Sequence, residues 1–237
     1  MSNIAVIIPC YNEALTIARV VSDFKTELSD AAIYVFDNNS TDGTGDEAAN
    51  AGATVLYEPI QGKGSVVRSM FRKIDADIYV MVDGDCTYPA AEVHRLIQPI
   101  KEGVAEMTVG DRISSKSYQQ ENKRMFHEFG NNLVRLLINR LFKADLKDIM
   151  TGYRAFSKAY VKTCPVMSDG FEVETELTLH ALDKKLNIIE IPIQYKDRPE
   201  GSKSKLNTYF DGLRILKTIV RVFKNYTPFT FFTTLGA

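Results

Sequence analysis

The sequence predicts an α/β fold in which helices flank a Rossmann-like, mainly parallel central sheet, with an amphipathic helix near the C-terminus. Short apolar runs rich in β-branched residues alternate with helical patterns through the first half of the chain, and such alternation is typical of βαβ units. Polar clusters directly follow three of these runs. The composition, 45% apolar and 25% charged over 237 residues, is that of an ordinary globular protein.

The predicted strands are short apolar runs bounded by polar or turn-forming residues. They cover residues 4–8, 33–36, 54–57, 78–82, 107–109 and 188–193. The run at 78–82 is apolar at every position, and we expect it to be buried on both faces of the sheet. Because ligands of parallel sheets bind beyond the carboxyl ends of the strands, the polar clusters mark a candidate site.

The predicted helices show apolar residues at helical spacing. They cover residues 14–28, 42–51, 63–73, 91–102, 124–142, 172–185 and 206–224. The last helix has an apolar stripe made by Tyr209, Leu213, Leu216, Val220 and Phe223. Its basic face is made by Arg214, Lys217, Arg221 and Lys224. Residues 196–224 hold eight Lys and Arg against three Asp and Glu. This pattern suits a helix at a membrane interface, and it also suits an ordinary helix that covers the sheet.

Charge and cysteine content argue against several classes of protein. A formal net charge of −1 gives no reason to expect nucleic-acid binding. The three cysteines, Cys10, Cys86 and Cys164, form no CxxC pair, which indicates a reducing compartment rather than a disulfide framework. The three histidines lack zinc-site spacing. We expect neither a signal peptide nor a membrane span, which would need roughly 18 consecutive apolar residues.

The most informative cluster is Asp83-Gly84-Asp85, at the end of the 78–82 run. Residues two apart in a strand share a face, and Gly84 allows the backbone to bend so that both carboxylates approach one hard cation. Mg²⁺ takes few protein carboxylates and completes its shell with substrate phosphates. The turn therefore suits a nucleoside diphosphate with Mg²⁺ or Mn²⁺. A polar turn after a core strand is the alternative interpretation of these three residues alone.

Two further clusters follow the first and second strands, and a glycine-rich loop follows the third. Pro9 ends the first strand and Glu13 begins the next helix, where an acidic side chain also favours the helix dipole. Asp37 ends the second strand, and its carboxylate could accept hydrogen bonds from a base or ribose. Lys63 lies in the loop Gln61-Gly62-Lys63-Gly64, which suits a phosphate and an ordinary turn equally well.

The order of these motifs resembles that of family 2 glycosyltransferases with the GT-A fold. The motifs are Pro-x-Tyr-Asn-Glu at 9–13, Asp-Asn-Asn-Ser-Thr-Asp-Gly-Thr at 37–44, Gln-Gly-Lys-Gly at 61–64 and Asp-Gly-Asp-x-Thr-Tyr-Pro at 83–89. Within that family the chain is most similar to the polyprenyl-phosphate glycosyltransferases, the relatives of dolichol-phosphate mannose synthase. The resemblance spans nearly the whole chain, and the ordered set is far more specific than any single motif.

On the donor side, the resemblance implies that a nucleotide lies among the first three motifs. The residues around it would be Pro9, Tyr11, Glu13, Asp37 and Lys63. Asp83 would lie beside the ribose or the metal, and Asp85 would bind the metal, Mg²⁺ or Mn²⁺, and the diphosphate. The mannose synthases carry a Gln that helps to hold the metal two residues after the second Asp, where this chain has Thr87.

On the acceptor side, the resemblance implies a group of phosphate-binding arginines. Residues 148–154, Asp-Ile-Met-Thr-Gly-Tyr-Arg, resemble the family's Asp-x-x-Ser/Thr-Gly-Phe/Tyr-Arg motif, and Arg112 lies in a sequence that resembles its Gly-x-Arg. Arg112 and Arg154 would bind phosphate through their planar guanidinium groups, and Asp148 would orient these arginines or act as a base. Arg198 and Lys203 lie in a loop that would close over the diphosphate.

The resemblance also implies a domain organisation and a reaction. Residues 1–205 would form the GT-A catalytic domain, with a nucleotide-sugar half at 1–110 and an acceptor half at 111–205, and residues 206–237 would form an amphipathic juxtamembrane segment. The enzyme would move a sugar, with inversion, from UDP-glucose or UDP-N-acetylglucosamine to a polyprenyl (undecaprenyl or dolichyl) phosphate. It would act at the cytoplasmic face of a membrane, with its oligomeric state open.

Other functions remain as alternatives. GDP-mannose could replace the UDP-sugar, or the chain could be a non-catalytic nucleotide-binding module that docks on membranes. A Rossmann dehydrogenase would require Gly-x-Gly-x-x-Gly after the first strand, where this chain has Pro-Cys-Tyr-Asn-Glu. A sugar-nucleotide pyrophosphorylase would require a glycine-rich Lys/Arg signature at the same place, and the chain has none.

Overall fold

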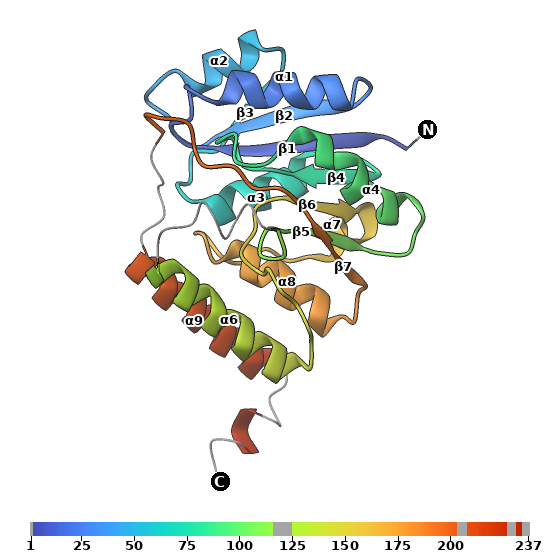
Figure 1. Cartoon of the computed structure of the whole chain (residues 1–237), viewed down its shortest axis with the longest axis vertical. Helices are drawn as coiled ribbons and strands as arrows, with labels where there is room; N and C mark the ends of the chain where they lie inside the picture. The colour runs from blue at the N-terminus through green and yellow to red at the C-terminus, as the bar shows by residue number, and fades with distance from the viewer. Residues whose placement is uncertain (1, 116–124, 203–207, 227–230, 234–237) are drawn as a thin grey trace.

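A seven-stranded sheet forms the centre of the computed structural model, with the strand order β3-β2-β1-β4-β6-β5-β7 (Figure 1). The structure describes residues 2–115, 125–202, 208–226 and 231–233. The strands are β1 (Ile4–Cys10), β2 (Ala32–Asp37), β3 (Thr54–Tyr57), β4 (Ile78–Met81), β5 (Met107–Asp111), β6 (Arg154–Ser157) and β7 (Ile188–Pro192). The helices are α1 (Ile17–Glu27), α2 (Thr44–Asn50), α3 (Lys63–Lys73), the short 3₁₀ helix η1 (Ala90–Glu92), α4 (Val93–Lys101), α6 (Met125–Phe142), α7 (Lys158–Thr163), α8 (Val173–Asp183) and α9 (Thr208–Tyr226).

The prediction of a mainly parallel, Rossmann-like sheet flanked by helices is confirmed. β1 pairs in parallel with β2 and β4, β2 pairs with β3, and β5 pairs with β7. The helices between these strands lie close to their predicted bounds, and α3 matches its prediction residue for residue. Strand and helix alternate here as the apolar runs require, so sequence periodicity and tertiary structure agree.

The sequence pattern does not predict β6 and α7. β6 lies between β4 and β5 and runs antiparallel to both, with Arg154 opposite Met81 and Val109. A strand of four residues that begins with arginine lacks the apolar pattern by which the other strands are recognised. The six-residue helix α7 follows directly, and Ser157 caps it by accepting a hydrogen bond from the backbone N–H of Tyr160.

Apolar side chains of the sheet pack against helices on both faces. β4 shows this division clearly, because successive residues of a strand point to opposite faces. Ile78 and Val80 belong to the cluster that contains side chains of α1 and α4. Tyr79 and Met81 belong to the cluster that contains side chains of α3, α7 and α8. β4 is therefore buried on both faces, as the wholly apolar run predicts.

Helices α6 and α9 lie side by side against the outer surface of α8 (Figure 1). A third apolar cluster joins them, with Val134 and Ile138 from α6, Leu179 from α8, and Ile215 and Ile219 from α9. The C-terminal helix thus covers another helix rather than the sheet itself. None of the helices in the described parts of the chain combines the length and apolarity that a membrane span requires.

The buried stripe of α9 differs from the predicted one. Leu213 is 67% exposed and Val220 is 54% exposed, whereas Phe223 is buried. The side chain of Tyr209 lies outside the described residues. The predicted stripe is therefore divided, because the helix buries Phe223 together with Ile215 and Ile219 and leaves Leu213 and Val220 on an outward face.

Candidate active site

The carboxyl ends of β1, β2 and β4 bring the predicted donor motifs to one edge of the sheet. β1 and β2 remain paired as far as Cys10 and Asp37. The segment before α1 closes over the end of β4, because Thr16 Oγ1 donates a hydrogen bond to the carbonyl oxygen of Gly84 at 2.6 Å. The turn at 83–85 is therefore held by the residues that follow β1, as its position in a parallel sheet predicts.

Close approach explains the glycine in this turn. A Cβ atom on Gly84 would lie 2.7 Å from Cys10 Sγ and 3.6 Å from Cγ2 of Ile8. The first distance is shorter than carbon and sulfur atoms tolerate without a shift, so a side chain at this position would push the turn away from β1. Gly84 therefore allows the two carboxylates to lie directly on the end of the sheet.

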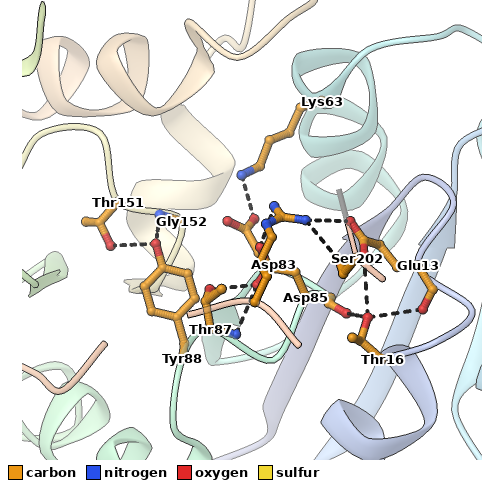
Figure 2. A network of polar contacts seen from close by, with 12 residues as sticks. Glu13, Thr16, Lys63, Asp83, Asp85, Thr87, Tyr88, Thr151, Gly152 and Ser202 are labelled. Atoms are coloured by element: carbon orange, nitrogen blue, oxygen red, sulfur yellow. Dashed lines mark hydrogen bonds and ion pairs between the residues drawn. The ribbon is translucent and has the colours of Figure 1, made fainter. Parts of the chain in front are cut away.

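Asp83 faces a lysine whose side chain is 11% exposed. Lys63 Nζ lies 2.5 Å from Asp83 Oδ1 (Figure 2) and 2.5 Å from Glu174 Oε1. Burial alone would lower the pKa of Lys63, but the two carboxylates outweigh this effect and raise the pKa, so the ammonium group stays charged. Because Lys63 begins α3 and Glu174 lies on α8, this ion pair also joins the first half of the chain to the second.

Asp85 faces an arginine from the segment after β7. Nη2 of Arg198 lies 2.6 Å from Asp85 Oδ2, and Nη1 lies 3.3 Å from Oε1 of Glu13. Burial lowers the pKa of Arg198, but Asp85 and Glu13 outweigh this effect and raise it. The other oxygen of Asp85 accepts hydrogen bonds from Thr87 N at 3.1 Å and Thr87 Oγ1 at 2.6 Å (Figure 2). Asp85 is only 3% exposed as a result.

The donor atoms at this edge fit a divalent cation that shares its shell with a diphosphate. Two carboxylates, Asp83 and Asp85, lie on one turn, and each already has a cationic group at hydrogen-bond distance. Within the described ranges, no group of three or more His, Cys, Asp or Glu side chains is arranged to hold a metal ion. Mg²⁺ usually takes one or two protein carboxylates and completes its shell with water and substrate phosphates, so two carboxylates on one turn suit such a site. Thr87 donates to Asp85 through its hydroxyl group and so fixes the orientation of this carboxylate.

The residues expected around the nucleotide lie at the same edge of the sheet. Tyr11 is 38% exposed, Pro9 is the penultimate residue of β1, and Asp37 Oδ1 accepts a hydrogen bond at 3.1 Å from a backbone N–H of the loop that follows it. Glu13 and Lys63 are occupied by the ion pairs described above. Contacts of these five side chains with a nucleotide stay predictions.

On the acceptor side, Arg112 and Asp148 form a bidentate pair. Nε and Nη2 of Arg112 lie 2.7 and 2.9 Å from the two carboxylate oxygens, and the backbone N–H of Arg112 donates to Oδ2 at 3.1 Å. The side chain of Asp148 is fully buried and that of Arg112 is 12% exposed. Both carboxylate oxygens are engaged, so the geometry favours Asp148 as the group that orients Arg112 over Asp148 as a base.

The prediction that Arg154 faces a phosphate is wrong. Its side chain is fully buried, because Arg154 opens a central strand and points into the layer of helices. Its guanidinium group donates to the carbonyl oxygens of Thr151 at 3.0 Å and Ile149 at 2.5 Å, and to Thr178 Oγ1 at 2.9 Å. Burial lowers the pKa of Arg154. Arg154 therefore fixes the loop at 149–152 rather than a ligand. Lys203, the other predicted cation, lies outside the described residues.

The sequence patterns do not mark three residues of the site as functional. Glu174 shares Lys63 with Asp83, and the alternating acids Glu172, Glu174 and Glu176 are a signal for it in the sequence. Asn38 accepts a hydrogen bond from Gly62 N at 2.7 Å and so fixes the glycine-rich loop. Tyr88 contacts Thr151 and Gly152 in the loop at 149–152, which we call the acceptor loop. No periodic pattern marks Asn38 or Tyr88, because their importance depends on tertiary contacts.

Comparison with known proteins agrees with this arrangement. The family model described as glycosyl transferase family 2 matches residues 5–164. The chain is 33% identical over 234 residues to glycosyltransferase AglJ of Haloferax volcanii. The aligned region covers 98% of this chain and 76% of AglJ. It is 28% identical over 220 residues to the dolichyl-phosphate hexose transferase of the same organism, and the aligned region covers 93% of each chain.

A solved structure shows the same fold. It is that of glucosyl-3-phosphoglycerate synthase from Mycobacterium tuberculosis in complex with Mn²⁺, UDP-glucose and phosphoglyceric acid, with a TM-score of 0.76 and 20% identity over 94% of this chain and 80% of the synthase. The family model covers well over half of the chain, and the sheet and helices have the GT-A arrangement. This chain is thus a glycosyltransferase that belongs to glycosyl transferase family 2.

Proposed function

We propose that this glycosyltransferase moves a hexose, with inversion, from a nucleoside-diphosphate sugar to a polyprenyl phosphate. UDP-glucose and UDP-N-acetylglucosamine are the favoured donors, and undecaprenyl or dolichyl phosphate is the acceptor. The observation that carries the proposal is the pair of carboxylates at the end of β4, Asp83 and Asp85, with Arg198 next to them. The similarity to a dolichyl-phosphate hexose transferase over nearly the full length of both chains supports the acceptor.

The donor would bind through Asp83, Asp85 and the loop that carries Arg198. A divalent metal ion, Mg²⁺ or Mn²⁺, would stabilise negative charge on the leaving diphosphate when bound there. Arg198 forms ion pairs with both Asp85 and Glu13 in this structure. We infer that the guanidinium group turns to the diphosphate when the metal complex of the donor occupies the carboxylates. Lys203, five residues further on, would add a second cation.

The acceptor would need no strong base. A phosphate monoester has its second pKa at about 6, so a lipid phosphate is largely ionised near neutral pH. Its oxygen attacks the anomeric carbon while the bond to the nucleoside diphosphate breaks, and this single displacement inverts the anomeric centre. Arg112, which Asp148 holds through a bidentate pair, would orient the incoming phosphate. Detection of a covalent glycosyl-enzyme intermediate would contradict this scheme.

The membrane surface is the proposed partner of the outward face of α9. Leu213 and Val220 are exposed there, and Lys217 and Lys224 on the same helix are exposed as well. Apolar side chains flanked by cations suit the boundary between anionic headgroups and acyl chains. Docking through this face at the cytoplasmic side of a membrane would bring the enzyme to its lipid acceptor.

The deciding experiment is a donor panel with a polyprenyl phosphate in detergent micelles. UDP-glucose, UDP-N-acetylglucosamine and GDP-mannose are each supplied with Mg²⁺ or Mn²⁺, and released nucleotide and lipid product are measured. We expect acceptor-dependent release of UDP and a lipid product with the mass of the sugar added and its anomeric configuration inverted. If only GDP-mannose gives a lipid product, the proposed donor is wrong and the chain is a GDP-mannose-dependent mannosyltransferase. No release from any donor, with vesicle binding retained, would favour the non-catalytic membrane-docking module.

A further inference from the structure

The hydroxyl group of Tyr88 connects the segment that follows the turn at 83–85, which we call the donor turn, to the acceptor loop at 149–152. Tyr88 lies three residues after Asp85, and its oxygen accepts a hydrogen bond from the backbone N–H of Gly152 at 3.0 Å (Figure 2). Thr151 Oγ1 donates to the same oxygen at 3.3 Å, and Nη1 of Arg112 donates to it at 3.4 Å. One hydroxyl group therefore contacts both the 151–152 peptide and the arginine proposed to orient the acceptor.

Gly152 is the point at which the acceptor loop touches the donor carboxylate. A Cβ atom at this position would lie 2.3 Å from Oδ2 and 2.6 Å from Cγ of Asp83. The backbone of the loop consequently packs directly on the Asp83 carboxylate, and no side chain fits between them. A small shift of the Gly152 peptide would change the surroundings of Asp83, so the group that holds this peptide also influences the donor carboxylate.

The ring of Tyr88 is held independently of its hydroxyl group. It packs against Tyr153, with ring centroids 5.4 Å apart, and against Tyr195 at 5.6 Å. Tyr88 is only 7% exposed. Burial raises the pKa of the hydroxyl, which therefore stays protonated and acts as a neutral hydrogen-bonding group. Removal of the oxygen atom alone would leave the ring in place and release the peptide and the arginine.

We propose that Tyr88 is a positioning residue for the transfer reaction, whose hydroxyl group holds the Thr151–Gly152 peptide and Arg112 at a fixed distance from Asp83. The inference rests on the proposed function. An attacking phosphate and a bound sugar nucleotide react only in a narrow range of geometries, and a misplacement of about 1 Å can cost on the order of 10²-fold in rate. Loss of the hydroxyl group should therefore lower kcat, and kcat/KM for the acceptor, more than it weakens binding of the donor.

The test compares Tyr88→Phe with Tyr153→Phe in the full chain. Tyr153 is the matched control, because its ring lies in the same aromatic group while its buried hydroxyl has no hydrogen-bond partner among the described residues. With whichever donor of the panel gives turnover, we expect Tyr88→Phe to lower kcat by about tenfold. The KM for the donor should stay within about twofold of the wild-type value. Tyr153→Phe should retain wild-type kinetics.

A second readout needs no turnover. Amide hydrogen exchange, measured by mass spectrometry on peptides that contain Gly152, should become faster in Tyr88→Phe and remain unchanged in Tyr153→Phe. If the wild-type chain transfers no sugar, the proposed function fails and this exchange measurement still decides whether Tyr88 holds the peptide. Equal exchange and equal kcat in Tyr88→Phe and the wild type would overturn the inference.

A second pair of variants covers the case in which Tyr88→Phe does not fold. Thr151→Val removes the hydroxyl that donates to Tyr88, whereas Thr151→Ser retains it. We expect a lower kcat and faster exchange at Gly152 for the valine variant, and recovery of both by the serine variant. Identical behaviour of the two variants would contradict the positioning role.

Discussion

The two halves of the sheet use their charged side chains in different ways. At the predicted donor site, Asp83 and Asp85 lie at the end of a parallel strand, and the cation beside Asp85, Arg198, comes from a loop and is 26% exposed. In the predicted acceptor half, the side chains of Asp148 and Arg154 are fully buried, and their polar atoms bond to other groups of the protein. Under the proposed function, the first set exchanges partners with the bound donor, and the second set stabilises the loops.

This difference shows that a family motif does not by itself assign a role to an arginine. Arg154 and Arg198 both lie in motifs that resemble those of the family, yet one opens a central strand and the other lies in a loop. We therefore expect substitutions at the predicted donor site to lower activity more than stability. Substitutions of the buried acceptor-half charges should lower stability first. Each variant below is measured for both properties.

The largest effect on activity is expected from Asp85→Asn. The amide cannot supply the negative charge that a metal ion requires, and a bound metal ion contributes several kcal/mol of charge stabilisation. We expect sugar transfer to fall by about 10²–10³-fold, with the free energy of unfolding changed by less than about 1 kcal/mol. Asp145→Asn, on an exposed loop residue, is the control and should retain full activity. A decrease of several kcal/mol in the free energy of unfolding of Asp85→Asn would contradict the distinction between the two sets of charged residues.

Arg198→Met is expected to lower kcat by about 10²-fold, because a cation that stabilises the leaving diphosphate is lost. The carboxylate partners of Arg198, Asp85 and Glu13, are nearly buried, so the loss of the cation should also cost about 1–3 kcal/mol of stability. Steady-state kinetics and urea unfolding measure the two quantities. If the free energy of unfolding falls by several kcal/mol and kcat is unchanged, Arg198 belongs with the structural arginines.

Arg154→Met should show the opposite behaviour. Methionine fills much of the same space but leaves the carbonyl oxygens of Ile149 and Thr151 without their donor, which costs about 2–3 kcal/mol in total. Any loss of activity should follow from the looser 149–152 loop. Arg140→Met, an exposed position on α6, should change stability by less than about 0.5 kcal/mol. Wild-type stability of Arg154→Met together with loss of phosphate binding would restore the original prediction for this residue.

The outward face of α9 gives a smaller effect. A cation near an anionic membrane surface contributes about 1 kcal/mol, so the double variant Lys217→Glu/Lys224→Glu should bind vesicles that contain anionic lipid at least about tenfold more weakly. The matched control is Arg72→Glu/Lys101→Glu, on helices α3 and α4, which should bind as the wild type does. Sedimentation with vesicles measures the difference, and equal binding by both double variants would exclude α9 as the docking face.

The smallest effect is a dependence of stability on pH through His180 of α8. Burial, followed by the nearby Lys184, lowers the pKa of His180, and neither ring nitrogen has a hydrogen-bond partner in the described part of the chain. The unfolded chain therefore binds a proton more readily, so stability should decrease as the pH falls below about 6.5. His180→Leu should weaken this dependence. An unchanged pH profile would show that other groups cause it.

The parallel half of the fold could be predicted from sequence because each of its strands is an apolar run and each connection is an amphipathic helix. The donor turn could be located for the same reason, since Asp83 and Asp85 directly follow such a run. β6 could not be predicted, because a short strand that starts with Arg154 depends on pairing with strands distant in sequence. The error at Arg154 has this cause, whereas the roles of Glu174 and Tyr88 depend on contacts with Lys63 and with the 151–152 peptide, which are distant in sequence.

The most direct test of the donor site is the binding of UDP with and without Mn²⁺, measured by titration calorimetry on the wild type and on Asp85→Asn. The account predicts that Mn²⁺ strengthens UDP binding to the wild type by at least about tenfold, and that Asp85→Asn loses most of this gain while Asp145→Asn retains it. Equal strengthening by Mn²⁺ in the wild type and in Asp85→Asn would show that the carboxylates at the end of β4 are not the metal and diphosphate site.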